Sequence, residues 1–299
     1  MTTKPVAEKL KWPEQARILS EALPNMRRFS GKTIVIKFGG HAMGDPGMAN
    51  LFARDIVLLR HVGINPIVVH GGGPQIGQML QRLNIESKFV DGLRITDKPS
   101  IEIVEMVLSG SINKSIVSSI NLAGATAIGI SGKDGNLILA KRLIRPTKQK
   151  NKEAQDLGLV GEPTKINPNI LAAFANNNII PVIAPIGMDQ NGETLNINAD
   201  TVAGAIASAV KAARLYMLTD VPGLLDKSGS LVSEVSISRA EKYIEQKVIS
   251  GGMIPKIETC ISAMKSGVDC AAIIDGRIEH SLLIELFTEG GAGTLIRAK

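Results

Sequence analysis

The stretch TIVIKFGG, residues 33–40, decides the fold of this chain, and PIVVHGGG, residues 66–73, repeats its pattern. Each is a run of apolar, mostly β-branched residues that ends in consecutive glycines. Such a run predicts a buried strand, at 33–38 and at 66–70, and the glycines predict a tight turn after it. Apolar residues between the two runs recur at helical spacing and predict a helix over 47–61. The region therefore alternates strand, helix, strand.

The same alternation continues to the end of the chain. We expect further strands at 125–131, 136–140, 179–185, 214–220 and 268–275, and further helices from Pro74, from a cap at Ser100 to about 122, at 167–176, at 199–213 and from Pro255 to about 266. A short helix and a strand close the chain. The polar stretch 141–165 is expected to be a loop, and 189–192 a turn. This order predicts an α/β fold with a mostly parallel sheet and helices on both faces.

Composition bounds the function classes. The 299 residues allow two domains or one large α/β unit. Aromatic residues make up only 3%, which suits buried strands under small-residue helices and suits base-stacking nucleic-acid binders poorly. The 34 basic and 28 acidic residues give a net charge of +6, which favours anionic ligands. The basic residues form no run of five or more, so we expect no nucleic-acid partner.

The cysteines and the amino terminus bear on the compartment. Cys260 and Cys270 form no CxxC pair, which favours two small core residues in a reducing cytoplasm. The first residues lack the apolar centre of a signal peptide and no 18-residue apolar run occurs, so neither export nor membrane insertion is expected. Residues 1–29 precede the first strand and carry an apolar helical stripe, with Pro24 expected to end or kink the helix. This extension is either a frayed terminal helix or a helix that binds a partner.

Two familiar phosphate-binding motifs fail. A Walker A loop ending at Gly31–Lys32–Thr33 requires glycine at position 26, which is Met26. A dinucleotide fingerprint beginning at Gly71 requires glycine at position 76, which is Ile76. HExxH, GxSxG and metal-ligand clusters are also missing, and His70, at a strand end, fits a hydrogen-bonded core residue better than a ligand. The chain is therefore expected to be neither a P-loop protein nor a Rossmann dehydrogenase.

Three glycine-rich strand ends and two lysines point to a bound anion instead. The turns are Gly39–Gly40, Gly71–Gly73 and Gly251–Gly252, where backbone N–H groups can approach a negative charge. Lys37 lies on a buried strand, which is costly unless its ammonium meets an anion. Lys256 lies in the first turn of a helix and opposes its dipole unless an anion lies between. A Lys37 that reaches solvent and a solvated Lys256 remain the alternatives.

Two further segments carry candidate binding groups. Arg94, in DGLRITD (91–97), can grip a carboxylate with its planar guanidinium or can simply be solvated. In NINAD (196–200), Asn198 or Asp200 would cap the following helix. An amide of this segment could instead hold a substrate carboxylate, and Asp200 could hold the two lysines.

Seven segments together resemble the amino acid kinase family, in chain order from about residue 20 to the end. They are KFGGHAM (37–43), VVHGGGPQIGQML (68–80), DGLRITD (91–97), LNINAD (195–200), LTDVPGLL (218–225), GGMIPKIETC (251–260) and ELFTEGGAGTLI (285–296). GLRITD and GGMIPK are specific within the family. They are similar to the member that phosphorylates N-acetyl-L-glutamate to N-acetyl-L-glutamyl 5-phosphate in arginine biosynthesis. The resemblance implies this activity and a three-layer αβα sandwich.

The resemblance also implies two lobes and residue roles. Residues 30–198 would bind the amino acid substrate and form a dimer, and residues 199–299 would bind ATP with Mg²⁺. Lys37 and Lys256 would be catalytic, with Asp200 organising them. The substrate would be bound by Gly72, Gly73, Arg94 and Asn196. The nucleotide would be bound by Gly40, Asp220, Gly223 and Gly252, and no residue would be a dedicated metal ligand.

Assembly and regulation follow from the same resemblance. An extension such as 1–29 accompanies homohexamers, built as trimers of dimers, and feedback inhibition by L-arginine. The segment from His280 through Glu285 to Gly293 resembles the arginine site, but Asn25 stands where sensitive relatives usually have tyrosine. An N-acetyl-aminoadipate kinase is the alternative activity, since one methylene distinguishes the substrates by only about 1–3 kcal/mol. A non-catalytic sensor is disfavoured because both lysines and Asp200 are present.

Overall fold

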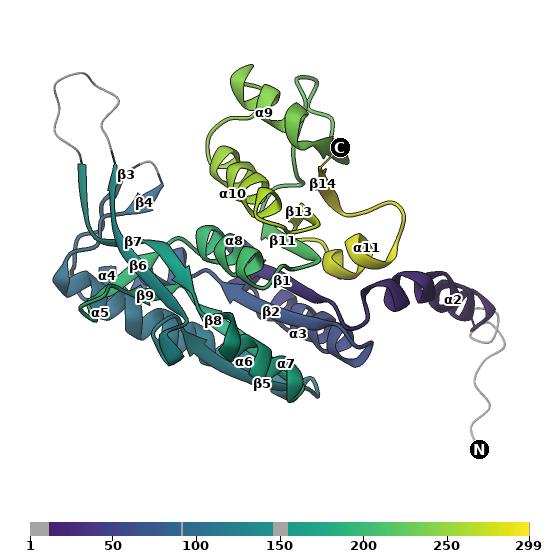
Figure 1. Cartoon of the computed structure of the whole chain (residues 1–299), viewed down its shortest axis with the longest axis horizontal. Helices are drawn as coiled ribbons and strands as arrows, with labels where there is room; N and C mark the ends of the chain where they lie inside the picture. Colours follow the sequence, from purple (N-terminus) through teal and green to yellow (C-terminus); the bar gives the residue numbers. More distant parts are fainter. Residues whose placement is uncertain (1–11, 91, 146–154, 299) are drawn as a thin grey trace.

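The computed structural model describes residues 12–90, 92–145 and 155–298, and an eight-stranded sheet forms its centre (Figure 1). The strands, from edge to edge, are β12 (Glu234–Ser236), β14 (Gly293–Arg297), β13 (Cys270–Asp275), β11 (Arg214–Thr219), β1 (Thr33–Phe38), β2 (Asn65–His70), β8 (Ile179–Ala184) and β5 (Thr126–Ser131). All neighbouring strands are parallel except β13 and β14. The predicted mostly parallel sheet is confirmed.

Helices cover both faces of this sheet, because its strands are apolar on both sides. On β1, Val35 belongs to one core cluster, whereas Ile34 and Ile36 belong to the other. The first cluster includes side chains of α7 (Pro168–Asn176), α8 (Ala199–Ala209) and α10 (Met253–Lys265). The second includes side chains of α3 (Pro46–His61), α4 (Gly73–Arg82), α6 (Asn113–Leu122) and α11 (Ser281–Phe287). The result is the expected three-layer αβα sandwich.

The long helix predicted from Ser100 differs from expectation at its start and in its middle. It begins at Lys98, because Asp97, rather than Ser100, is the cap and accepts a hydrogen bond from the Ser100 N–H at 2.9 Å. The segment comprises α5 (Lys98–Glu105), the π-helix η2 (Met106–Ile112) and then α6. Periodicity alone did not reveal the π turn, which packs beside the glycine loop that follows β2.

The prediction of a loop over 141–165 is wrong for its described part. Strands β6 (Ile138–Arg145) and β7 (Gln155–Ile166) pair antiparallel, and with β9 (Ile186–Met188) and β10 (Thr194–Ile197) they close a small barrel. The segment is polar enough to predict a loop because one face of this hairpin is exposed, whereas its other face is in the core. Leu157 and Leu159 are buried there. Residues 146–154 of the predicted loop lie outside the described residues.

The amino-terminal extension forms α2 (Trp12–Phe29), which projects from the sandwich beside α11 (Figure 1). Pro24 lies within this helix and does not end it. Proline lacks an N–H, so one helical hydrogen bond is lost, and the carbonyl that would have accepted it lies in an exposed turn. The stripe residues Ile18, Leu19 and Leu23 are 55%, 66% and 50% exposed. Residues 1–11 of the extension lie outside the described residues. Within the described part of the chain, no helix is long and apolar enough to cross a membrane.

Smaller elements complete the fold. They are η1 (Gly40–Met43), β3 (Phe89–Val90), β4 (Leu93–Arg94), η3 (Asp134–Asn136) and α9 (Ile237–Glu245). Both cysteines are free, Cys260 buried and Cys270 half-buried, in keeping with their predicted packing role. The compartment of the protein stays a prediction.

Candidate active site

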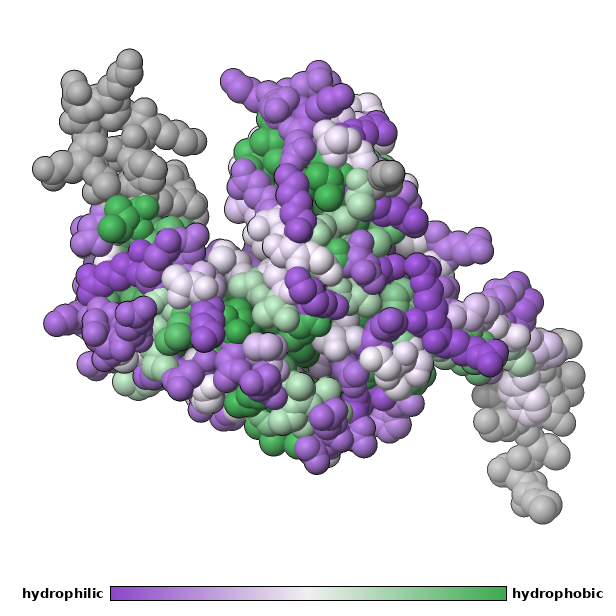
Figure 2. All heavy atoms as spheres, in the orientation of Figure 1, coloured by the Kyte–Doolittle hydropathy of each residue, from purple (hydrophilic) through white to green (hydrophobic). Residues whose placement is uncertain are grey.

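A pocket of about 270 Å³ lies at the carboxyl ends of β1 and β2. Parallel strands end at the same edge, so the turns after β1 and β2 and the start of α8 converge there. β4 and α10 form opposite walls, and Figure 2 shows the molecule hollowed between these two regions. Eight of the predicted site residues line the pocket: Lys37, Gly40, Gly72, Gly73, Arg94, Asn196, Asp200 and Lys256.

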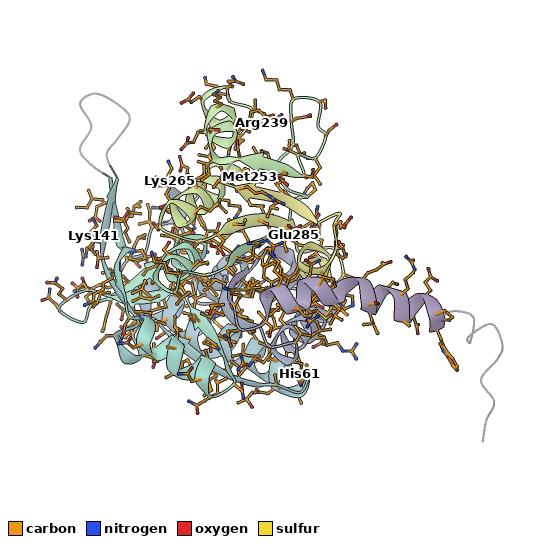
Figure 3. The ribbon with its side chains drawn as sticks, turned by 45° about the vertical axis from the view of Figure 1, so that its right-hand side comes forward. His61, Lys141, Arg239, Met253, Lys265 and Glu285 are labelled. Carbon is orange, nitrogen blue, oxygen red and sulfur yellow. The ribbon has the colours of Figure 1, made fainter. Side chains whose placement is uncertain are left out.

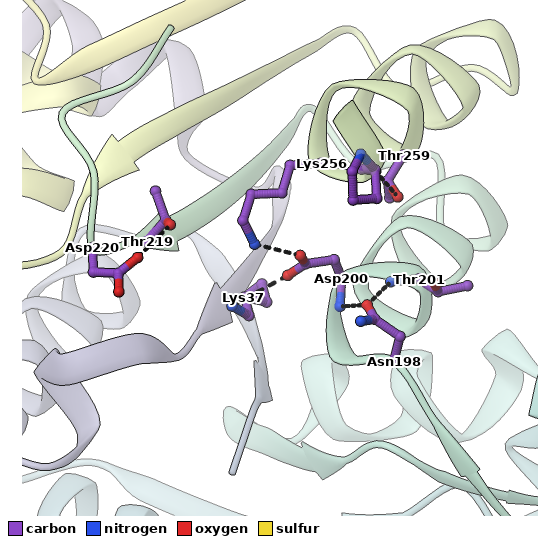
Figure 4. Close-up of polar contacts among 9 residues, drawn as sticks. Lys37, Asn198, Asp200, Thr201, Thr219, Asp220, Lys256 and Thr259 are labelled. Carbon is purple, nitrogen blue, oxygen red and sulfur yellow. Dashed lines mark hydrogen bonds and ion pairs between the residues drawn. The ribbon is translucent and has the colours of Figure 1, made fainter. Parts of the chain in front are cut away.

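Two lysines meet on one buried carboxylate at the base of this pocket (Figure 4). Lys37 Nζ lies 3.2 Å from Asp200 Oδ1, and Lys256 Nζ donates to Asp200 Oδ2 at 2.6 Å. Asp200 supplies the anion that a lysine on a buried strand and a lysine in the first turns of α10 both require. Two ammonium groups against one carboxylate leave one positive charge, so the cluster still attracts an anion.

The electrostatics keep this carboxylate ionised. Burial by itself raises the pKa of Asp200. The charges of Lys37 and Lys256, with the hydrogen bonds that they donate, outweigh burial and hold the pKa of Asp200 below its usual range. At neutral pH the carboxylate therefore stays charged and fixes both ammonium groups.

The start of α8 shows why Asp200 is available for this role. Asn198 caps the helix: its side-chain oxygen accepts from the Asp200 N–H at 2.9 Å and the Thr201 N–H at 3.2 Å. Of the two cap candidates that the sequence offered, the structure uses Asn198. The carboxylate of Asp200 therefore faces the lysines rather than the helix backbone.

The glycine loop after β2 lies flat against the π segment. A Cβ at Gly72 would lie 2.5 Å from Ile112 Cδ1 and 2.7 Å from Leu108 Cδ2, so a larger residue there would have to displace the ends of these two side chains. Gly73 opens α4, whose first N–H groups have no partner within the helix. The loop thus presents backbone donors close to the lysine cluster.

Arg94 is held at the opposite wall by three groups that the sequence did not identify as partners. Its Nη2 donates to Gly73 O at 2.9 Å, its Nη1 donates to Ser87 Oγ, and its guanidinium lies 4.5 Å from the Phe89 ring centroid. Burial lowers the pKa of Arg94. Ser87 and Phe89 reach Arg94 because β3 and β4 pair antiparallel, with Phe89 opposite Arg94.

Asn196 completes this wall from β10. Its Nδ2 donates to Thr96 Oγ1 at 3.2 Å, and Thr96 Oγ1 in turn donates to Arg94 O at 3.1 Å. Thr96 is fully buried, and no sequence signal distinguished it. The hydroxyl of Thr96 therefore connects the amide of Asn196 to the backbone of Arg94.

The four predicted nucleotide residues are divided in space. Gly40 lines the pocket in a left-handed conformation, and a Cβ there would lie 3.7 Å from Asp220 Cβ. Asp220 accepts from Thr219 Oγ1 at 3.3 Å (Figure 4), and Gly223 packs against Thr294. Gly252 precedes α10. Asp220, Gly223 and Gly252 do not line the pocket; they lie on the α10 and β11 side of the molecule.

Among the described residues, no group of three or more His, Cys, Asp or Glu side chains is placed to hold a metal ion. His70 is completely buried and hydrogen-bonded, as the sequence indicated.

The chain is similar in sequence to known proteins. The sequence profile of the amino acid kinase family matches residues 32–275. The acetylglutamate kinase of Rhodospirillum rubrum is 59% identical over 290 residues, which cover 96% of this chain and 94% of that protein. The acetylglutamate kinase of Gluconobacter oxydans is 58% identical over 288 residues, covering 95% and 98%.

Solved structures share the fold. N-acetylglutamate synthase from Neisseria gonorrhoeae, complexed with coenzyme A and N-acetyl-glutamate, superposes with a TM-score of 0.82 at 25% identity over 95% of this chain. This chain spans 63% of the length of that synthase. Carbamate kinase from Giardia lamblia bound to AMP-PNP has a TM-score of 0.64 at 16% identity, covering 89% of this chain and 98% of that one.

Proposed function

Because the chain belongs to the amino acid kinase family, and within it to the acetylglutamate kinases, we propose that this pocket transfers the γ-phosphoryl group of ATP to N-acetyl-L-glutamate. The product is N-acetyl-L-glutamyl 5-phosphate, an intermediate of arginine biosynthesis. The observation that carries the assignment of the pocket is the convergence of Lys37 and Lys256 on Asp200 beside the glycine loop.

The chemistry needs charge stabilisation more than acid–base help. The side-chain carboxylate of the substrate is already an ionised nucleophile, so no general base is required. A bond forms between a carboxylate oxygen and the γ-phosphorus, the bond to the β,γ-bridging oxygen breaks, and ADP leaves. The obstacle is the approach of two anions. Lys37 and Lys256, preorganised on Asp200, offset negative charge on the phosphoryl oxygens, and Asp200 itself touches no reacting atom.

The other residues would orient the two substrates. Arg94 would grip the non-reacting carboxylate of acetylglutamate, with Asn196 beside it, and the N–H groups of Gly72 and Gly73 would receive the reacting end. Gly40 would let the backbone approach the transferring phosphoryl group. Asp220, Gly223 and Gly252 would seat the nucleotide from the β11 and α10 side.

Mg²⁺ enters this proposal as part of the MgATP substrate. Phosphate oxygens and water usually supply most of its ligands, so the protein needs no cluster of carboxylates for it. Each lobe would then bind one substrate. Residues 30–198 would bind the amino acid and form the dimer, and residues 199–299 would bind the nucleotide.

Trapping the product with hydroxylamine tests this function directly. Purified protein with MgATP and N-acetyl-L-glutamate should form a hydroxamate, and N-acetyl-L-aminoadipate in its place should give much less. Unacetylated glutamate is the matched control for the acetyl group. A protein that hydrolyses ATP without forming a hydroxamate, or that prefers aminoadipate, would contradict the proposal.

Feedback inhibition by arginine and assembly as a homohexamer form a second part of the proposal. Glu285, on α11 beside α2 (Figure 3), accepts from the Ala292 N–H at 2.7 Å, and Asn25 Nδ2 on α2 donates to Phe287 O at 3.4 Å. Burial raises the pKa of Glu285. A half-buried acidic group on α11, beside α2, supports a site for a guanidinium or ammonium group. The apolar stripe on α2 supports an interface between dimers.

Deletion of residues 1–29 tests the second part. The shortened chain should stay folded and active, its mass should fall from hexamer to dimer by light scattering, and any inhibition by arginine should weaken. Leu19→Asp is the matched point variant, because it charges the stripe without removing the helix. An unchanged mass in both variants would exclude α2 from the interface.

A further inference from the structure

Beneath the glycine loop, three polar side chains form a hydrogen-bonded row, two of them buried and the third exposed, that the reaction itself does not use. They are His70, at the end of β2, Asn113, which opens α6, and Lys114. His70 and Asn113 are both 0% exposed. Buried polar groups are costly unless every donor and acceptor has a partner, so the hydrogen bonds of such a row can be assigned one after another.

Lys114 fixes the orientation of the Asn113 amide. An ammonium group can only donate, and Lys114 Nζ lies 3.1 Å from Asn113 Oδ1 and 2.9 Å from Gly129 O. The oxygen of the amide therefore faces the lysine. Its nitrogen faces the other way, 2.9 Å from Val182 O on β8 and 3.2 Å from Nε2 of His70.

The Asn113 amide in turn fixes the tautomer of His70. An amide nitrogen is a donor only, so Nε2 of the ring must be the acceptor and the ring proton must lie on Nδ1. Nδ1 lies 2.8 Å from the carbonyl oxygen of Gly71 and donates to it. Burial lowers the pKa of His70 to about 4, which keeps the ring neutral at physiological pH.

The Gly71 carbonyl connects this row to the pocket. In a trans peptide the C=O and the following N–H point in opposite directions, so anchoring Gly71 O on the ring turns the N–H of Gly72 away from His70. Gly72 rests on Leu108 and Ile112 of the π segment, which ends where Asn113 begins. The π segment therefore supports the loop, and the residue that directly follows it fixes the histidine.

We propose that His70 is a positioning residue that aims the Gly72 N–H at the anionic substrate, with Asn113 and Lys114 holding its Nδ1–H tautomer. This inference rests on the proposed function for the identity of the substrate, but the tautomer itself does not depend on it. The alternative is a purely structural role, in which the row only joins β2, β8 and α6. Packing of that kind would not require the ring proton to lie on Nδ1.

Two substitutions at position 70 separate aiming from packing. His70→Asn keeps an amide N–H where Nδ1 stood, whereas His70→Leu fills similar space without a donor. His70→Leu should raise the KM for acetylglutamate about tenfold, as expected for one hydrogen bond to a charged group, and change the KM for ATP by less than about twofold. His70→Asn should recover most of that loss. His61→Leu, the same substitution at the exposed end of α3 (Figure 3), is the control and should leave both KM values unchanged.

Equal rises for the Leu and Asn variants, or parallel rises in both KM values, would overturn the proposal. ¹⁵N NMR of the unmodified full-length protein gives an independent reading if a variant fails to fold. The His70 ring should show a protonated Nδ1 and an unprotonated Nε2 at pH 7, and an Nε2–H tautomer or a charged ring would overturn the inference. A wild-type protein that forms no hydroxamate would reject the proposed function alone, because the tautomer is measured without substrate.

Discussion

One pocket lies at the carboxyl ends of the central strands and another at their amino ends. The two differ in whether their charged groups remain available to a ligand. The pocket at the carboxyl ends of β1 and β2 has a volume of about 270 Å³. A second pocket of about 400 Å³ lies at the amino ends of β2 and β8, between α7 and the end of α8. The larger pocket is not the one where the predicted site residues gather.

Arg60 explains the difference. It lines the second pocket, but its guanidinium is occupied by the protein itself: Nη1 donates to Ile64 O at 3.2 Å and to Asn65 Oδ1, and Nη2 donates to Ala175 O at 3.1 Å and to Asn178 Oδ1. At the other end, two lysines share one carboxylate. The two lysine ammonium groups keep hydrogen-bond donors for a ligand, whereas the guanidinium of Arg60 is engaged by four oxygens of the protein. This difference, rather than cavity volume, distinguishes the candidate active site from the second pocket.

The strongest way to break this comparison is to remove one lysine. Lys37→Ala or Lys256→Ala should lower kcat by roughly 10²–10³-fold, the usual cost of losing a preorganised charge stabiliser. Melting temperature and KM for acetylglutamate should change far less. Steady-state kinetics with circular dichroism would check this, and near-normal turnover in either variant would remove that lysine from the mechanism.

Neutralising Asp200 should have the next largest effect. Asp200→Asn removes the shared anchor, and a shift of the ammonium groups by about 1 Å should lower kcat by roughly 10²-fold or less. Because the folded-state pKa of Asp200 lies below its ordinary value of 3.8, its ionisation contributes stability above that pH, and this contribution is lost as the pH falls through the lower folded-state value. The free energy of unfolding should therefore fall more steeply in acid for the wild type than for Asp200→Asn. Parallel acid limbs would contradict the pKa assignment.

Arg94→Lys should act on one substrate only. The lysine keeps the charge but loses the planar fork, so the KM for acetylglutamate should rise about tenfold while the KM for ATP stays within about twofold. Initial-rate kinetics with each substrate varied in turn would measure this. Equal effects on both substrates would place Arg94 outside the amino acid pocket.

Arg60→Met sharpens the comparison from the other end of the sheet and should have the smallest effect on catalysis. Kinetic constants should stay within about twofold, since the site is distant. The free energy of unfolding should fall by about 1 kcal/mol, because partly buried carbonyl and amide oxygens lose a charged donor. Chemical denaturation beside the kinetic assay tests both statements. A large loss of kcat would show that the second pocket is coupled to the first.

The features that could be predicted from the sequence are those that short-range patterns determine. Apolar runs ending in glycine located β1 and β2, and the cost of burying Lys37 correctly indicated an anion near it. The small barrel was missed because β6 and β7 expose one polar face, and period-2 burial at Leu157 and Leu159 is too brief to stand out in polar sequence.

The remaining features depend on chain segments far apart in sequence. Asn198 and Asp200 were equal candidates for the cap of α8, and the choice is made by Lys37 and Lys256, which only the folded sheet brings to Asp200. Ser87 and Phe89 are partners of Arg94 only because the hairpin of β3 and β4 brings them to it. Local pattern could not identify either arrangement, because neither has a periodic signature.

The position of β1 in the sheet also bears on how the chain folds as it is synthesised. β1 pairs with β2 on one side, which follows it closely, but with β11 on the other, which begins only at Arg214. At about 5–20 residues per second, the ribosome needs on the order of ten seconds or more to supply that partner. During this time β1 has an unpaired apolar edge open to other nascent chains. The strand that supplies Lys37 is therefore also the place where chaperone binding during translation would matter most.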